Sequence, residues 1–163
     1  MIVSLDYVSL DVFEGLAPAP DMLAISIGDH DQAPPANLVD FSASLRLAFL
    51  DCDEVEAAVY GIAADNLFSA QQLAQVVDFV KHHHARAEPL RLVVHCRMGS
   101  SRSSAVALVA HHLTQSAFPR QPDAHFANSH VLRLAACELG EIRVPQKTIG
   151  PEPHPYLPVH LQI

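Results

Sequence analysis

Residues 90–113, LRLVVHCRMGSSRSSAVALVAHHL, decide how the rest of the chain is interpreted. The stretch Leu90–His95 is apolar and predicts a buried strand that leads into Cys96. The stretch after Arg102, SSAVALVAHHL, is apolar around almost the whole helical circumference and predicts a buried helix. A buried strand that passes through a short loop into a buried helix is typical of α/β proteins.

Other short apolar runs extend this pattern toward the N-terminus. Met22–Ile27 (MLAISI) and Leu45–Leu50 (LRLAFL) predict two more buried strands, and Ile2–Leu5 is a candidate for a fourth. Runs of this kind suit a parallel sheet that is covered on both faces. We therefore expect the α/β class, with a central, mostly parallel sheet flanked by helices.

Two further helices have recognisable ends. Ser69 and Gln72 have the spacing of a capping box, and the apolar residues that follow recur at helical spacing. This crossover helix separates the second and third predicted strands of the sheet. Asn128 is a good N-cap for a last helix that runs to Leu139, where Gly140 ends it.

Composition indicates one folded domain. The chain has 163 residues, of which 50% are hydrophobic and 17% charged, so it is not a disordered protein. We expect a single domain over residues 1–140. The remaining residues, 141–163, carry five prolines, and we expect an irregular tail that packs on the domain or extends from it.

Charge and hydropathy exclude several partners. The net charge of −8 argues against a general nucleic-acid binder, which needs a basic face. No apolar run approaches the roughly 18 residues of a membrane-spanning helix, and the first residues lack the basic start of a secretory signal. We therefore expect a cytoplasmic protein with no nucleic-acid or membrane partner; the sequence does not indicate its oligomeric state.

Neither the cysteines nor the histidines predict a metal centre. The three cysteines include no C-x-x-C pair, which argues against a disulfide framework or a zinc knuckle. His82, His83 and His84 are consecutive at a predicted helix end, so their side chains point in different directions and cannot share one metal ion. We expect them to be solvated or to compensate the dipole at the helix C-terminus, and we expect no metal and no cofactor.

The loop between the strand and the buried helix has the features of an anion site. Its residues can curl so that successive N–H groups point inward, and the following helix directs its partly positive N-terminus at the same point. Arg102 adds a planar fork that matches two phosphate oxygens. These donors favour the thiolate form of Cys96, which is then a nucleophile aimed at a bound phosphate.

The segment HCRMGSSRS (95–103) resembles the signature loop of the cysteine-dependent protein tyrosine and dual-specificity phosphatases, His-Cys-x5-Arg-Ser/Thr. The chain from about residue 22 to 140 also resembles the small dual-specificity type and, more loosely, a bacterial branch of tyrosine phosphatases. The resemblance implies a phosphotyrosine-phosphatase-like fold. It implies Cys96 as nucleophile, Arg102 as ligand of the phosphate and transition state, and Ser103 as a hydroxyl that assists the departing thiolate. The substrate phosphate would contact Arg97, Met98, Gly99, Ser100, Ser101 and Arg102.

The family also uses an aspartate as general acid, on a loop after another strand. Asp51 follows the predicted strand 45–50 directly and is our first choice. Asp53 lies two residues further on. Asp65 has the commoner spacing to Cys96 but lies close to a helix start. All three remain candidates.

The variable loop positions bear on the substrate. They include Arg97 but no lysine, and relatives that act on inositol phospholipids tend to place lysines there. We therefore expect a phosphatase for phosphotyrosine, with phosphoserine and phosphothreonine as further substrates. The alternatives are a phosphatase for a small-molecule or RNA phosphate, and a module that binds phosphorylated partners without hydrolysing them.

Overall fold

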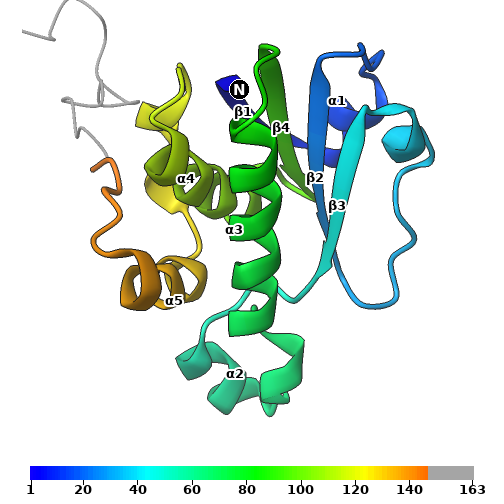
Figure 1. Ribbon diagram of the computed structural model, residues 1–163. Coiled ribbons are helices and arrows are strands. Elements are labelled where there is room, and N and C mark those ends of the chain that lie inside the picture. Colours follow the sequence, from blue (N-terminus) through cyan, green and yellow to red (C-terminus); the bar gives the residue numbers. More distant parts are fainter. Residues whose placement is uncertain (147–163) are drawn as a thin grey trace, which may run out of the picture.

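A computed structural model gives the structure of residues 1–146, so the predicted tail from residue 147 onward lies outside the described residues. The centre of the molecule is a four-stranded sheet whose strands all run parallel, in the order β1-β4-β2-β3 (Figure 1). The strands are β1 (Ile2–Ser9), β2 (Met22–Gly28), β3 (Ala43–Ala48) and β4 (Leu90–Cys96). The predicted α/β class, with a parallel sheet flanked by helices, is confirmed.

The strand predicted over residues 45–50 is shifted along the sequence. β3 begins at Ala43 and ends at Ala48, two residues before the predicted end at Leu50. The N–H of Phe49 still donates to the carbonyl of Gly28 (3.1 Å), but the N–H of Leu50 turns away to the carbonyl of Asn66 (2.8 Å). Asp51 therefore follows a short non-strand segment instead of the strand itself.

Helices cover the two faces of the sheet unequally. On one face lie α3 (Ala70–His84), α4 (Arg102–Thr114) and α5 (Ser129–Leu139), which share the main apolar core with the strands (Figure 1). On the other face lie α1 (Leu10–Glu14) and the 3-10 segment Ala36–Asp40, over a smaller cluster around Phe13 and Val93.

The three predicted helices are confirmed, together with their ends. Ser69 and Gln72 form the capping box of α3, and Asn128 caps α5 by accepting from the N–H of Val131. Every residue of α4 from 102 to 110 is buried, as the all-round apolar pattern predicts. Gly140 follows the last residue of α5.

Two short α-helices, α1 and α2 (Glu54–Tyr60), were not predicted. In α2 the carboxylate of Asp53 accepts from the first N–H groups, and Gly61 ends the helix in the left-handed conformation (φ 66°). Only Ala57 of α2 is buried, while Val55 and Tyr60 are exposed. Because α2 has almost no buried stripe, its sequence carries no helical periodicity.

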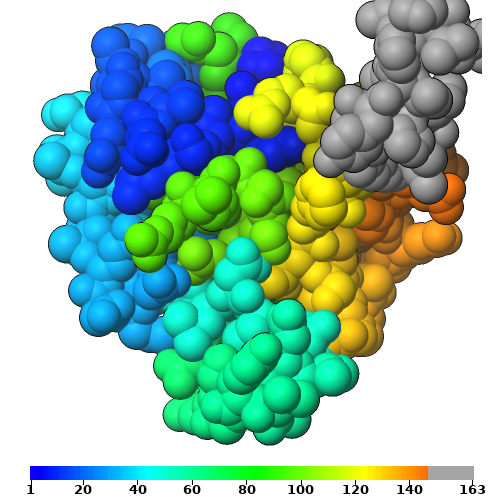
Figure 2. All heavy atoms as spheres, turned by 180° about the vertical axis from the view of Figure 1, so that it is seen from behind, coloured from blue at the N-terminus to red at the C-terminus, as the bar shows by residue number. Residues whose placement is uncertain are grey.

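The parallel arrangement gathers four loops at one edge of the sheet. The chain leaves the sheet after Ser9, Gly28, Ala48 and Cys96, and parallel strands end on the same side. In Figure 2 the residues around Cys96, in lime green, lie between the blue segment that follows β1 and the cyan to teal segment that follows β3. Open α/β sheets bind ligands at this edge.

Candidate active site

The last two residues of β4 point to opposite faces of the sheet. Cys96 is 1% exposed and belongs to the main core on the α4 side. His95 lies on the other face, where its ring stacks on Phe13 (centroids 4.0 Å apart) and its Nε2 lies 2.7 Å from the hydroxyl of Ser26. His95 thus supports the loop from behind, on the face of the sheet opposite Cys96.

Burial controls the protonation of His95. Removal from water lowers the pKa of this imidazole to about 4, and the positive charge of Arg46 acts in the same direction. Arg46 also donates to the Ser26 hydroxyl (2.8 Å) that contacts His95. The ring is therefore neutral near pH 7 and serves as a packed, uncharged support.

Gly99 lets the loop lie directly on the end of β1. Its φ is +67°, a conformation that residues with side chains rarely adopt. A Cβ at this position would lie 2.3 Å from the backbone nitrogen of Ser9 and 2.5 Å from the carbonyl carbon of Val8. The N–H of Leu10 donates to the carbonyl of Arg97 (3.2 Å), which fixes the same contact. The glycine thus permits both the curl and the close approach.

The sulfur of Cys96 faces hydrogen-bond donors. The N–H of Gly99 donates to Sγ (3.3 Å), and the hydroxyl of Ser103 lies 3.2 Å from it. Ser103 is in the first turn of α4, whose opening N–H groups have no acceptor within the helix. Amide and hydroxyl donors beside a helix N-terminus are the surroundings of a reactive cysteine.

The start of α4 is not capped by its own N-cap residue. Ser101 makes no side-chain hydrogen bond to the helix N–H groups. Its hydroxyl donates instead to Oδ1 of Asp51, at 2.6 Å. The first turn of α4 is therefore available to an anion. The same hydrogen bond joins the loop to the acid segment, the residues after β3 that include Asp51.

Arg102 is held in place on one side of its guanidinium. Its side chain is 5% exposed, and Nη1 donates to Oδ1 of Asp29 (2.7 Å) and to the carbonyl of Phe49 (2.7 Å). Its buried Nε has no hydrogen-bond partner among residues 1–146 and lies 4.0 Å from Oδ2 of Asp51. Nη1 thus anchors the Arg102 side chain, and the Nε–H group remains as a hydrogen-bond donor for a ligand.

Asp29 is a site residue that sequence reasoning missed. It follows β2 in the turn Gly28–Asp31, which the sequence marks only as a loop. Its partner Arg102 is 73 positions away, and the two meet because β2 and β4 are neighbours in the sheet. The apolar sequences of β2 and β4 do not predict that these two strands are neighbours in the sheet.

The structure brings one of the three candidate acids against the loop. Asp51 accepts from Ser101 and from the side-chain amide of Asn128 (2.9 Å). Asp53 is instead the N-cap of α2, where hydrogen bonds from the backbone N–H groups of Glu56 and Val55 lower the pKa of its carboxyl. Asp65 lies exposed in the 3-10 segment Ala64–Asn66, away from this group of contacts.

Side chains from the first turns of α5 contact the segment that carries Asp51. Asn128 both caps α5 and donates to Asp51. Two residues further along, Nδ1 of His130 lies 2.8 Å from Oε1 of Glu54, while its Nε2 lies 2.7 Å from the carbonyl of Phe68. Arg133 also pairs with Glu54. These contacts tie the acid segment and α2 to α5.

Two hollows border the loop. One, of about 680 Å³, lies toward β1 and β2 and is lined by Leu10, Asp11, Asp29, Asp31, Gln32, Arg97 and Met98. The other, of about 310 Å³, lies toward the acid segment and α5 and is lined by Asp51, Asp53, Glu56, Ser101 and residues 126–129. We call them the β-side hollow and the α5-side hollow. Of the predicted contact residues, Arg97, Met98 and Ser100 are exposed.

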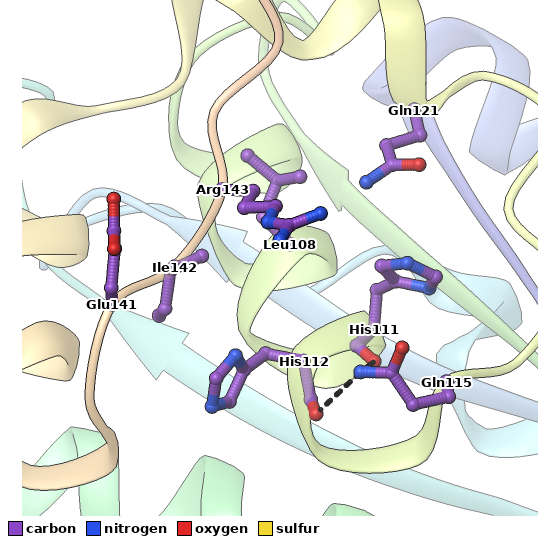
Figure 3. Close-up of a pocket in the computed structure, with 8 residues that line it drawn as sticks. All are labelled: Leu108, His111, His112, Gln115, Gln121, Glu141, Ile142 and Arg143. Carbon is purple, nitrogen blue, oxygen red and sulfur yellow. Dashed lines mark hydrogen bonds between the residues drawn. The ribbon is translucent and has the colours of Figure 1, made fainter.

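A third cavity, of about 500 Å³, lies apart from the loop, between α4 and residues 141–143 (Figure 3). Its histidines already have partners, since Nδ1 of His111 lies 2.9 Å from the carbonyl of Ser116 and Nε2 of His112 lies 3.1 Å from that of Leu139. It shares no residue with the loop and holds none of the predicted site residues.

Other predictions are corrected or given context. His82, His83 and His84 lie in the last turn of α3, as expected. His83, however, is buried and packs on Phe79 (ring centroids 4.6 Å apart), so solvation, one of its two expected roles, is wrong for this residue. Burial lowers the pKa of His83. Within residues 1–146, no cluster of three or more metal-ligating side chains is arranged to hold an ion. The helices in that same range are too short or too polar to span a bilayer.

Comparison of the chain with protein-family models, curated proteins and solved structures found no match.

Proposed function

We propose that this protein is a cysteine-dependent phosphatase with a phosphotyrosine-phosphatase-like fold, which hydrolyses phosphomonoesters through a cysteinyl-phosphate intermediate. One observation carries the proposal. The sulfur of Cys96 lies at the base of a loop that contributes an amide donor (3.3 Å), a hydroxyl (3.2 Å), an uncapped helix N-terminus and the buried guanidinium of Arg102. This combination suits a tetrahedral dianion with its phosphorus facing the thiolate.

In the first step the Cys96 thiolate attacks phosphorus. An S–P bond forms as the P–O bond to the leaving group breaks, and the carboxylic acid of Asp51 gives its proton to the departing oxygen. Arg102 binds equatorial oxygens with the half of its fork that faces the site, while Asp29 holds the other half. Charge on the transferred group thus meets fixed donors that need no rearrangement.

In the second step water attacks the cysteinyl-phosphate. The carboxylate of Asp51 takes a proton from that water, the S–P bond breaks, and Cys96 leaves as thiolate with the Ser103 hydroxyl as donor. Free phosphate is released and Asp51 is protonated again for the next cycle. Because the nucleophile must stay reduced, we also propose a cytoplasmic location.

Phosphotyrosine is the substrate that we favour, followed by phosphoserine and phosphothreonine. Arg97 is the one additional cation within the loop, and the chain carries a net charge of −8. Few positive charges are therefore available to neutralise a polyanionic lipid headgroup. A substrate with a single phosphate needs only Arg102 and the loop amides.

Cysteine variants test the proposal. Wild type should release phosphate from p-nitrophenyl phosphate and phosphotyrosine peptides in the presence of chelator, and vanadate should inhibit by occupying the loop. Cys96→Ser should abolish turnover yet still bind vanadate, because the amides and Arg102 remain. Cys137→Ser, at an exposed cysteine far along α5, is the matched control and should retain activity. Phosphopeptide binding by wild type without any turnover would replace the proposal with a binding module.

A further inference from the structure

Both hollows beside the Cys96 loop are acidic. The β-side hollow is lined by three carboxylates, Asp11, Asp29 and Asp31. The α5-side hollow is lined by the carboxylates of Asp53 and Glu56 and by Asp51, which the proposed mechanism requires to be protonated when substrate binds. The only cation that lines the first is Arg97, and none lines the second within the described part of the chain. The two hollows therefore carry negative charge on both sides of a site built for an anion.

Much of this charge is not compensated by the protein. Arg102 pairs with Asp29 and faces Asp51, and Arg46 is also close enough to interact with Asp29. No ion pair involves Asp11, Asp31 or Glu56 within residues 1–146. Asp11 and Asp31 are also exposed, so a bound ligand can reach them.

An independent feature marks the point between the hollows as a ligand position. The Nε of Arg102, in a side chain that is 5% exposed, has no hydrogen-bond partner in the described residues and faces Asp51 at 4.0 Å. A buried donor of this kind is costly unless a ligand satisfies it. A phosphate oxygen satisfies it and fixes the phosphorylated residue between the two acidic hollows.

Each hollow also exposes one large apolar side chain. Met98 is 74% exposed in the β-side hollow, and Phe126 is 63% exposed in the α5-side hollow. Lysine and arginine place their aliphatic stems on such surfaces while their charged ends reach nearby carboxylates, and a cation is also attracted to the face of an aromatic ring. Exposed apolar groups among carboxylates therefore match basic side chains.

The two-sided arrangement favours a peptide over a small molecule. The β-side hollow touches the beginning of the loop at Arg97 and Met98, whereas the α5-side hollow touches its end at Ser101, and the two share no residue. A chain that crosses the loop therefore places residues in both. We infer that the substrates are phosphotyrosine peptides with lysine or arginine on both sides of the phosphorylated residue; this inference rests on the proposed phosphatase function.

Three synthetic phosphotyrosine peptides of equal length test the inference, with lysine, alanine or glutamate at the positions flanking the phosphotyrosine. The kcat/KM of wild type should be about tenfold higher for the lysine than for the glutamate peptide, because lysine forms exposed ion pairs with the hollows and glutamate is repelled by them. Because salt screens exposed charges, this ratio should shrink when ionic strength rises from about 0.01 to 0.5 M.

Reversing charges in the β-side hollow tests whether its carboxylates cause the preference for the lysine peptide. The double variant Asp11→Lys/Asp31→Lys should lower the lysine-to-glutamate ratio to about one or invert it. The double variant Asp78→Lys/Glu138→Lys is the matched control, since it makes the same change in net charge at exposed residues of α3 and α5 that line neither hollow, and it should keep the wild-type ratio.

Equal kcat/KM values for the three peptides, or a preference of wild type for glutamate, would overturn the inference and leave the phosphatase proposal intact. Failure of wild type to hydrolyse any peptide or p-nitrophenyl phosphate would overturn the phosphatase proposal, and the inference with it.

Discussion

The buried histidine behind the loop gives a prediction about stability. His95 lies under the Cys96 loop, stacked on Phe13 and 2.7 Å from the Ser26 hydroxyl. Burial, helped by the charge of Arg46, lowers its pKa from 6.5 to about 4. The unfolded chain therefore binds a proton at this residue at a higher pH than the folded protein does. The contribution of His95 to stability must therefore fall as pH drops below 6.5 and stop falling near pH 4.

The size of this effect follows from the shift. A difference of one pKa unit corresponds to about 1.4 kcal/mol, so full protonation costs the folded state on the order of 3 kcal/mol. Between pH 7.5 and 5.5 the same linkage removes about 1.4 kcal/mol, because the unfolded state is then mostly protonated at this position. At pH 7.5 the contribution is close to zero.

Urea unfolding of wild type and His95→Asn at pH 7.5, 6.5 and 5.5 measures this contribution. The variant should be less stable at pH 7.5, since it loses the stacked ring. Its stability should then decline less steeply with acid, so that the gap to wild type narrows by about 1.4 kcal/mol at pH 5.5. Parallel declines of the two proteins would refute the reasoning, because they would show that His95 titrates alike in the folded and unfolded states.

Three further predictions concern turnover. Asp51→Asn should remove the alkaline limb of the pH profile of kcat. It should lower kcat about 100-fold or more with an alkyl phosphate, but less with p-nitrophenyl phosphate, whose leaving group needs little protonation. Equal losses of kcat with both substrates would contradict the role of Asp51 as acid. Arg102→Lys keeps the charge but loses the planar guanidinium that Asp29 holds, so kcat should fall by about 100-fold or more. Arg97→Ala should mainly change the relative kcat/KM among substrates. Similar losses of kcat for the two variants would mean that the wrong arginine is assigned to the phosphate. Gly99→Ala must displace the loop from Ser9, and should reduce kcat/KM at least about tenfold, as measured on folded protein of unchanged circular dichroism.

Much of the fold could be predicted because its core elements are strongly patterned. The strand 90–96 is almost continuously apolar, residues 105–110 of α4 are all apolar, and α3 and α5 carry recognisable caps. α2 could not be predicted, because its helix is short and buries only Ala57. The end of β3 was misplaced because Phe49 and Leu50 are as apolar as the strand before them, although the N–H of Leu50 leaves the sheet and donates to the carbonyl of Asn66.

The candidate site was predictable only where it is local in sequence. Cys96, Gly99, Arg102 and Ser103 lie within eight residues of each other, and their spacing, together with the apolar strand before them and the apolar helix after them, predicts the loop. The Asp29 contact with Arg102 depends on the order of strands in the sheet, which no apolar run specifies. The choice among the acids likewise depends on the docking of α5, since Asn128 contacts Asp51 from 77 positions away.

The strand order has a consequence for synthesis of the protein. Within residues 1–146, β4 is the last strand along the chain, lies between β1 and β2, and is the only strand that pairs with β1. A nascent chain therefore exposes the open edges of β1 and β2 until residue 96 has left the ribosome, and such edges invite association with other chains. Insertion of β4 also closes contacts between residues nearly 90 positions apart, which is a slow step of folding. Since the Cys96 loop is attached to that strand, the sheet and the nucleophile reach their final places in the same event.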